Sequence, residues 1–151
     1  MQELVNKLKA KNLTIGSVES MTGGLFASSI TSVPGASKVF KGSVISYSPE
    51  IKEKVVGVNK STIEQFDVVS KEVAEEMARK GLKVLNVDIC VSVTGNAGPT
   101  SEPGKAGVGE VYIGVATKEK CVVTKKLFSG NRDEIRKKTL LAMQEDVLKC
   151  I

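Results

Sequence analysis

SVESMTGGLFASSITSVPGASKVFKGSVISYSPEIKEKVVG, residues 17–57, contains the most informative turns of this chain. A strand that ends near Glu19 runs directly into the turn Gly23-Gly24, and the small side chains that follow predict a closely packed helix. Residues 39–46 are rich in β-branched side chains and predict a second strand. A strand, a turn, a helix and another strand in this order are typical of an α/β sheet.

The rest of the chain continues this alternation. Strands are expected at residues 13–19, 39–46, 87–93, 111–117 and 121–128, and helices at residues 2–11, 49–54 and 132–149, with two more that begin at Ser61 and Ser70. The last two strands are close enough in sequence to form a hairpin, so the sheet should be mixed. We therefore expect one α/β domain, residues 1–151, with helices on both faces of a mixed sheet.

Three polar residues mark expected helix starts. Ser61, with Glu64 three residues later, predicts a capping box, and Ser70 predicts the start of a longer amphipathic helix. Asn131 precedes the last helix and can cap it. The inward faces of the last two of these helices are expected to carry Val73, Met77, Leu82, Ile135, Met143 and Val147.

Composition limits the setting and the partners. The chain is 41% hydrophobic and 26% charged, and it has neither an apolar run of about 18 residues nor the apolar core of a signal peptide. Its three cysteines show no metal-type spacing, so we expect a reducing, cytoplasmic setting with no membrane partner and no metal. The net charge of +5 comes from lysines interspersed with acids, so we expect no nucleic-acid partner but attraction of small anions.

The absence of histidine shapes the search for a catalytic site. A serine nucleophile needs a base, and lysine can serve where burial lowers its pKa. Ser37 lies in a proline-glycine loop, while Tyr47 closes a strand and Lys52 follows in the next helical turn, so the three form a candidate catalytic set. The alternative is a solvated lysine and a tyrosine that merely ends a strand.

Three loops are candidate substrate sites. The turn Thr22-Gly23-Gly24 offers backbone N–H groups to an anion or oxyanion, or is only a tight turn. The glycine-rich segment 95–109 is a substrate loop or a flexible connection, and it contains neither GxGxxG nor a P-loop motif, which argues against a dinucleotide-dependent oxidoreductase. Arg132 can contact a phosphate, or it is an exposed arginine beside a plain cap at Asn131.

Several strings in order, ESMTGG, PGASKVFKGSVISYSPEIK, VVSKEVAEEMA, TGNAGP and GNR, resemble the C-terminal domain family of the competence/damage-inducible protein CinA. The resemblance extends from about Leu4 to Leu148. Stand-alone members of that family include nicotinamide-nucleotide amidases. The resemblance implies an α/β/α sandwich and hydrolysis of nicotinamide mononucleotide to nicotinic acid mononucleotide and ammonia, without a cofactor.

The same resemblance implies roles for individual residues. Ser37, Tyr47 and Lys52 match a tyrosine-assisted Ser-Lys mechanism. The implied substrate-binding residues are Thr22, Gly23, Gly24, Thr94, Gly95, Asn96, Gly98 and Arg132. This chain departs from the usual family pattern at Asn96, normally aliphatic, at Asn131, normally Asp, and at Gly107, where a proline is usual nearby.

Two function classes therefore remain open. An amidase acting on nicotinamide mononucleotide, or on a different amide, is favoured because the three candidate catalytic residues are present. A non-catalytic nucleotide-binding or regulatory module of the same fold is the alternative that the altered loop favours. The sequence also leaves open whether the domain forms a homo-oligomer.

Overall fold

A computed structural model describes residues 1–151. Its five-stranded sheet has the order β2-β1-β3-β4-β5. The strands are β1 (Ile15–Glu19), β2 (Phe40–Ile45), β3 (Ile89–Gly95), β4 (Glu110–Thr117) and β5 (Cys121–Leu127). Strands β1, β2 and β3 are parallel, and β4 is antiparallel to both β3 and β5, which confirms the mixed sheet with a terminal hairpin.

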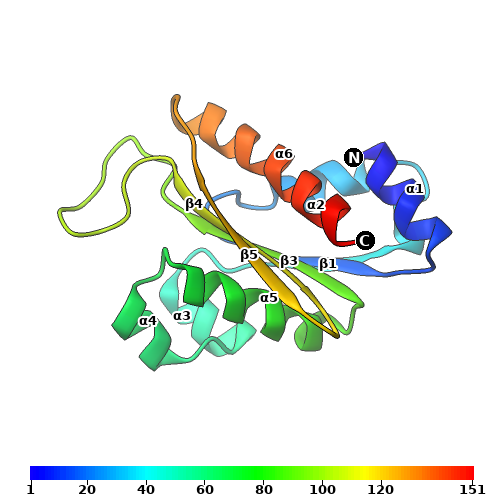
Figure 1. The fold of residues 1–151 in the computed structure, drawn as a ribbon, viewed down its shortest axis with the longest axis horizontal. Coiled ribbons are helices and arrows are strands. Elements are labelled where there is room, and N and C mark those ends of the chain that lie inside the picture. The colour runs from blue at the N-terminus through cyan, green and yellow to red at the C-terminus, as the bar shows by residue number, and fades with distance from the viewer.

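Helices cover both faces of the sheet and form a three-layer α/β/α sandwich (Figure 1). One layer contains α1 (Gln2–Ala10), α2 (Leu25–Thr31) and α6 (Arg132–Cys150), and the other contains α3 (Pro49–Ile51), its π-helical continuation η2 (Lys52–Val56), α4 (Lys60–Phe66) and α5 (Lys71–Leu85). A single 3₁₀ turn, η1 (Ala36–Lys38), precedes β2. No helix is both long enough and apolar enough to span a bilayer.

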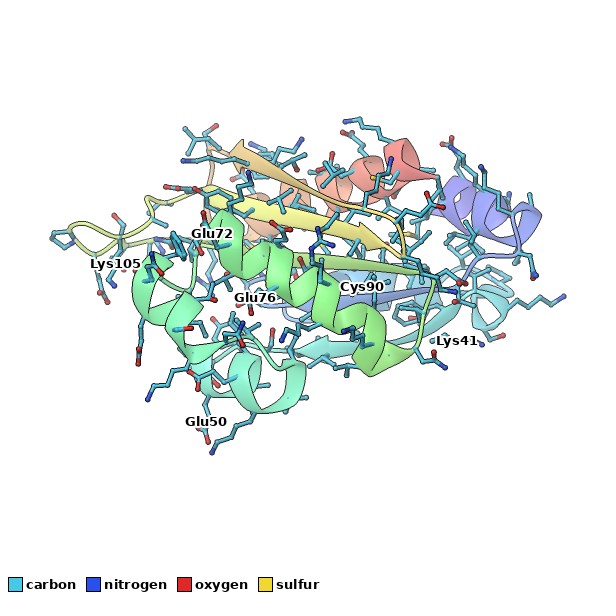
Figure 2. All side chains as sticks on the ribbon, turned by 60° about the horizontal axis from the view of Figure 1, so that its bottom comes forward. Lys41, Glu50, Glu72, Glu76, Cys90 and Lys105 are labelled. Carbon is cyan, nitrogen blue, oxygen red and sulfur yellow. The ribbon has the colours of Figure 1, made fainter.

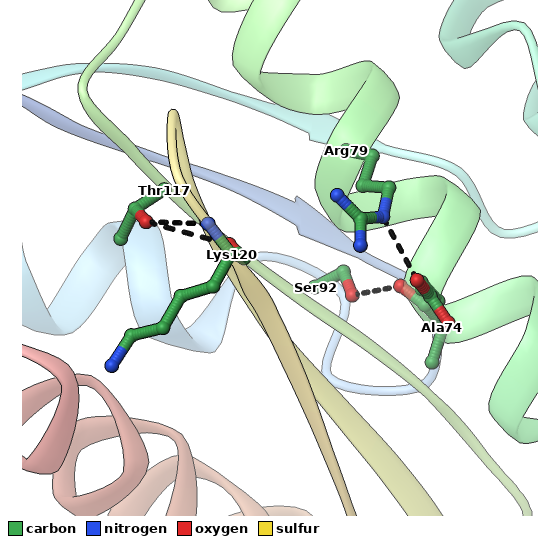
Figure 3. A network of polar contacts seen from close by, with 6 residues as sticks. Ala74, Arg79, Ser92, Thr117 and Lys120 are labelled. Carbon is green, nitrogen blue, oxygen red and sulfur yellow. Dashed lines mark hydrogen bonds and ion pairs between the residues drawn. The ribbon is translucent and has the colours of Figure 1, made fainter.

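The core has two parts because each face of the sheet packs against its own helices. The larger part joins the sheet to α1, α2 and α6, and the smaller one lies between the sheet and α5. Helix α5 approaches the sheet very closely at Gly81, where a Cβ atom would lie 2.4 Å from the sulfur of Cys90. About two helical turns earlier, the Ser92 hydroxyl on β3 donates a 2.6 Å hydrogen bond to the Ala74 carbonyl of α5 and so also connects this helix to the sheet (Figure 3).

The helix starts test the capping predictions. Ser70 and Asn131 both accept a hydrogen bond from a backbone N–H in the first turn of their helices, as predicted. The prediction of a capping box at Ser61 is wrong, because α4 already begins at Lys60. Asn59 precedes α4, and its side chain donates a hydrogen bond to Glu76 of α5 rather than capping its own helix.

The connections create a crevice at one edge of the sheet. The chain leaves β1 toward α2 on one face and leaves the neighbouring strand β2 toward α3 on the other face. In α/β sheets, ligands bind outside the carboxyl ends of strands whose connections diverge in this way. The long loop between β3 and β4 projects from the same edge (Figure 1).

Candidate active site

A cavity of about 230 Å³ lies at the carboxyl ends of β1, β2 and β3. Residues from five segments line it: Ser20 and Met21 after β1, Tyr47, Pro49 and Lys52 after β2, Val68 and Val69 before α5, Thr94, Gly95 and Ala97 at the end of β3, and Arg132 at the start of α6. The parallel strands bring these distant segments together, since their carboxyl ends share one edge of the sheet. The cavity therefore occupies the crevice that the topology creates.

Lys52 is the unusual residue of this cavity. Its side chain is only 2% exposed, and no carboxylate lies within ion-pair distance of it. Its Nζ donates hydrogen bonds to Ser20 Oγ at 2.9 Å and to the Ser46 carbonyl at 2.6 Å. Burial without a compensating negative charge lowers the pKa of Lys52 to about 8. With this pKa, roughly a tenth of the amine is neutral at pH 7, against less than about a thousandth for an ordinary lysine, so Lys52 can act as a base.

Local structure after β2 places the lysine. Ser48 caps α3 by accepting a hydrogen bond from the Ile51 N–H, and Pro49 occupies the first helical turn as predicted. The helix then widens into the π-helical turn η2, which begins at Lys52 and ends at Gly57 with a positive φ of 89°. Short π-helical segments are often found at functional sites, and here the turn carries the lysine back under the end of β2.

Ser20 meets the lysine from the neighbouring strand. It is the first residue after β1 and is 7% exposed. Its N–H donates to the Val93 carbonyl of β3 at 3.1 Å, while the Ser46 N–H beside β2 donates to the Glu19 carbonyl at 2.8 Å. The serine and the lysine are thus held by backbone hydrogen bonds across three adjacent strands.

Tyr47 and Arg132 lie together at the rim of the cavity. Tyr47 is 62% exposed, and its hydroxyl accepts a hydrogen bond from Arg132 Nη2 at 3.0 Å. Arg132 Nη1 also donates to the Gly98 carbonyl at 2.5 Å. The tyrosine has no hydrogen bond to Lys52, so its partner is the arginine of α6, which connects the turn after β2 to the glycine-rich loop.

Ser37 lies elsewhere. It is exposed in η1, at the amino end of β2, where it borders a separate hollow of about 380 Å³ that contains no lysine and no acid. Six residues of strand separate this turn from the segment that carries Tyr47 and Lys52, a distance of about 20 Å at about 3.3 Å per residue. The expectation that Ser37, Tyr47 and Lys52 form one cluster is therefore not met, because the serine and the lysine flank opposite ends of one strand.

The turn Thr22-Gly23-Gly24 lies behind the cavity rather than in its lining. The Thr22 hydroxyl and the Gly24 N–H both donate to Glu19 Oε2, at 2.7 and 3.1 Å. The same buried carboxylate accepts hydrogen bonds from two N–H groups at the start of α2. Glu19 thus satisfies the Gly24 N–H and the start of α2, which the sequence offered to a substrate anion, but it does not bind the Thr22 N–H.

The glycine-rich loop forms a second hollow of about 370 Å³, which shares Val68, Val69 and Gly95 with the cavity. Thr94 contacts the cavity, but its hydroxyl donates to the Val68 carbonyl. Lys105 forms a 2.6 Å ion pair with Asp67 across this hollow and lies on the projecting loop (Figure 2). The structure therefore joins the loop to the cavity.

The Asn96 side chain forms three hydrogen bonds within this loop. Its side-chain amide nitrogen donates to the Thr100 and Ala106 carbonyls, and its oxygen accepts from the Gly98 N–H at 2.8 Å. An aliphatic residue could make none of these three bonds. The departure from the usual family pattern therefore adds cross-links within the loop.

The contact between Ser20 and Lys52 was not predicted from the sequence, although the turn that follows Ser20 was singled out. The signal was present, because a serine directly after a buried parallel strand and before a glycine turn has the strand–turn–helix context of a nucleophile. Glu19 was missed for a different reason: a buried carboxylate that accepts several N–H groups has no local sequence signature.

The fold and the pair at its centre define an α/β protein with a serine hydroxyl hydrogen-bonded to a buried, uncompensated lysine. Residues 1–151 match the family model of the CinA C-terminal domain. The chain belongs to the CinA C-terminal domain family, as the sequence motifs indicated.

Individual relatives agree with this assignment. The chain is 51% identical over 142 residues to a protein of Thermoanaerobacter pseudethanolicus whose name refers to competence and damage induction, a match covering 93% of this chain and 34% of that protein. The chain spans about a third of the length of the curated relatives it matches. A crystal structure of a competence/damage inducible protein from Agrobacterium tumefaciens has a TM-score of 0.91 at 27% identity, covering 98% of this chain and 93% of that one. A CinA superfamily protein from Escherichia coli shares the fold, with a TM-score of 0.96 at 23% identity over 99% of this chain and 87% of that chain.

Proposed function

We propose that this domain is an amidase that hydrolyses nicotinamide mononucleotide to nicotinic acid mononucleotide and ammonia, with Ser20 as nucleophile and Lys52 as general base. The observation that carries the proposal is the 2.9 Å hydrogen bond between Lys52 Nζ and Ser20 Oγ in a cavity open to a small substrate. Ser20 takes the role expected of Ser37, because a nucleophile must lie within hydrogen-bond reach of its base.

The reaction uses the lysine twice. Neutral Lys52 accepts the Ser20 proton as Oγ attacks the carboxamide carbon, and the resulting ammonium returns a proton to the leaving nitrogen, which departs as ammonia. A water molecule then attacks the acyl-enzyme while Lys52 accepts its proton, and the ammonium returns that proton to Ser20 Oγ as the acyl C–O bond breaks. The acid product leaves as its carboxylate and releases its proton to solvent. The lowered pKa of Lys52 suits both steps, since the amine must gain and lose a proton near neutral pH.

The shape of the site supports a nucleotide amide. At about 230 Å³, the cavity is smaller than the roughly 300–1,000 Å³ of common ligand pockets and suits the carboxamide and its ring. The adjoining hollow of about 370 Å³ can take the remainder of the nucleotide. Arg132, which has no carboxylate partner, and the rim hydroxyl of Tyr47 are suited to orient the phosphate-bearing part.

The proposal is tested by measuring ammonia release from nicotinamide mononucleotide with purified protein and with Ser20→Ala. Release by the unmodified protein alone, with a nicotinoyl group on Ser20 detected by mass spectrometry after a rapid acid quench, would support both the activity and the nucleophile. Binding of the nucleotide without release would favour the non-catalytic nucleotide-binding module. Release of ammonia only from other amides would retain the mechanism and replace the substrate.

A further inference from the structure

The backbone turn that follows Ser20 has two N–H groups without partners. The Met21 and Thr22 N–H groups donate no hydrogen bond within the chain, whereas the Ser20 and Gly23 N–H groups both do. Met21 is the residue directly after the proposed nucleophile and lines the cavity. In hydrolases whose serine sits on a strand-to-helix turn, the N–H after the nucleophile is an oxyanion donor.

Arg136, on α6, holds the opposite side of this turn. Its Nε donates to the Met21 carbonyl at 3.1 Å and its Nη2 to the Thr22 carbonyl at 2.9 Å. A trans peptide is planar, with its N–H pointing away from its C=O. Because the Met21 carbonyl and the Thr22 N–H belong to one peptide, the bond from Arg136 to this carbonyl directs the Thr22 N–H away from Arg136. The bond from Arg136 to the Thr22 carbonyl fixes the next peptide, whose Gly23 N–H donates to the Ser20 carbonyl.

The guanidinium of Arg136 forms no ion pair in the structure. No carboxylate lies within 4.0 Å of its guanidinium, so two backbone carbonyls are its partners. Charge-assisted hydrogen bonds are stronger than neutral ones, and chains of hydrogen bonds polarise one another. A cation on the Met21 carbonyl therefore makes the Thr22 N–H of the same peptide a stronger donor.

We propose that Arg136 is a positioning residue, which holds and polarises the Ser20–Gly24 turn so that the Met21 and Thr22 N–H groups stabilise the oxyanion formed at Ser20. This inference rests on the proposed function, since it assumes that Ser20 is acylated. It adds a residue that contacts neither substrate nor the reacting atoms. It also gives α6 a second contact with the site, one helical turn from Arg132.

The test follows acetylation of Ser20 by p-nitrophenyl acetate, a small activated ester that needs oxyanion stabilisation but not recognition of a nucleotide. The burst of p-nitrophenolate gives the acylation rate, and mass spectrometry identifies the acetylated serine. For Arg136→Met we expect the acylation rate at saturating ester to fall about 10- to 100-fold, below the roughly 10²–10³-fold cost of removing an oxyanion donor outright, with unchanged half-saturation. Arg79→Met, which removes an exposed arginine paired with Glu75, is the matched control and should acylate normally.

Two further variants separate positioning from simple structural support. Arg136→Lys should recover part of the rate, because one ammonium can reach one of the two carbonyls. Arg136→Ala should be accelerated by low, non-denaturing concentrations of guanidinium, which can occupy the vacated site. A slow variant that guanidinium does not accelerate, or one with raised half-saturation, would make Arg136 only a structural residue.

The remaining outcomes distinguish this inference from the proposal beneath it. If the unmodified protein is acetylated on Ser20 and Arg136→Met is acetylated equally fast, the positioning role is overturned and the Ser20–Lys52 mechanism survives. If the unmodified protein is not acetylated on Ser20, the proposed nucleophile fails and the role of Arg136 fails with it.

Discussion

At the amino end of β2, Ser37 lies in an exposed turn beside a hollow that no lysine or acid lines, whereas at the carboxyl ends of β1 and β2 Ser20 lies against the buried amine of Lys52. Both serines lie in glycine-containing loops next to a strand, and both belong to strings that resemble the same family. The difference between them is their tertiary surroundings: only the carboxyl edge of a parallel sheet gathers turns from several strands. A serine is thus a candidate nucleophile by what packs beside it, rather than by its local sequence.

Two buried ionisable side chains at the carboxyl ends of β1 and β2, Glu19 and Lys52, also differ in what packs beside them. Glu19 is fully buried, and its carboxylate accepts hydrogen bonds from three backbone N–H groups of the α2 turn and from Thr22. Lys52 is equally buried but has only a hydroxyl and a carbonyl as partners. The saturated charge stabilises a helix terminus, whereas the unsaturated one keeps a lowered pKa and is available for proton transfer.

The sharpest contrast is expected from the two serines. Ser20→Ala should lower kcat for nicotinamide mononucleotide by at least about 10³-fold, because removal of a nucleophile leaves only binding and oxyanion stabilisation. Ser37→Ala should retain full activity, since its exposed hydroxyl lies at the opposite end of β2 from Lys52. Ammonia release with both variants checks this, and loss of activity in Ser37→Ala alone would return the nucleophile to the amino end of β2.

Replacing the lysine should separate activity from stability. Lys52→Met should abolish turnover and raise the free energy of unfolding by about 1–2 kcal/mol at pH 7. Burial of the uncompensated charge costs about 3 kcal/mol, and loss of the two hydrogen bonds of Nζ offsets part of that gain. Lys38→Met, at the amino end of β2, should change neither quantity. Denaturant unfolding and ammonia release test both variants, and a destabilised Lys52→Met would mean that the lysine is chiefly structural.

The gain in stability expected for Lys52→Met should itself depend on pH. Folding lowers the pKa of Lys52 from 10.5 to about 8, so between these values the unfolded chain binds more protons and the stability of the natural protein rises with pH. Below about pH 8, both states are protonated and the cost of burying the charge is complete. The advantage of Lys52→Met should therefore be largest below pH 8 and shrink toward pH 10.5, and an advantage that grows with pH would reverse the assigned shift.

The pH dependence of catalytic activity should also follow the ionisation of Lys52, with a smaller effect. As a base, Lys52 must be neutral, so kcat/KM should rise with pH to a half-maximum near pH 8 and fall roughly tenfold per unit below it. Lys38→Met should leave this profile unchanged. Formation of the acid product between pH 6 and 9 provides the measurement, and a flat profile would remove Lys52 as the base.

The smallest effect is expected in the glycine-rich loop. Asn96→Leu removes three hydrogen bonds that cross-link this loop and should raise KM by about threefold to tenfold, with kcat nearly unchanged. Asn6→Leu, on the exposed face of α1, is the matched control and should leave KM unchanged. Initial rates over a range of substrate concentrations separate the two parameters. An unchanged KM in Asn96→Leu would show that the loop does not need these bonds to bind substrate.

Much of the fold could be predicted because its signals are local. Strand positions, the stripe of α5, the cap at Ser70 and the cap at Asn131 each depend on side chains within a few residues of one another. The prediction at Ser61 failed because Asn59 and Thr62 bond Glu76 of α5, a tertiary contact that overrode the local capping pattern. Strand ends also moved by up to two residues, as with β3 at Ile89–Gly95.

The sequence by itself determined the α/β class, the mixed sheet and the family, and it singled out Lys52 as a candidate base, since each follows from motifs that are short along the chain. Only the tertiary structure decided which serine faces that lysine. Ser20 and Lys52 are 32 residues apart and meet because β1 and β2 pair in parallel with their carboxyl ends at one edge. The lowered pKa likewise depends on burial among several separate segments, a property that no single stretch of sequence contains.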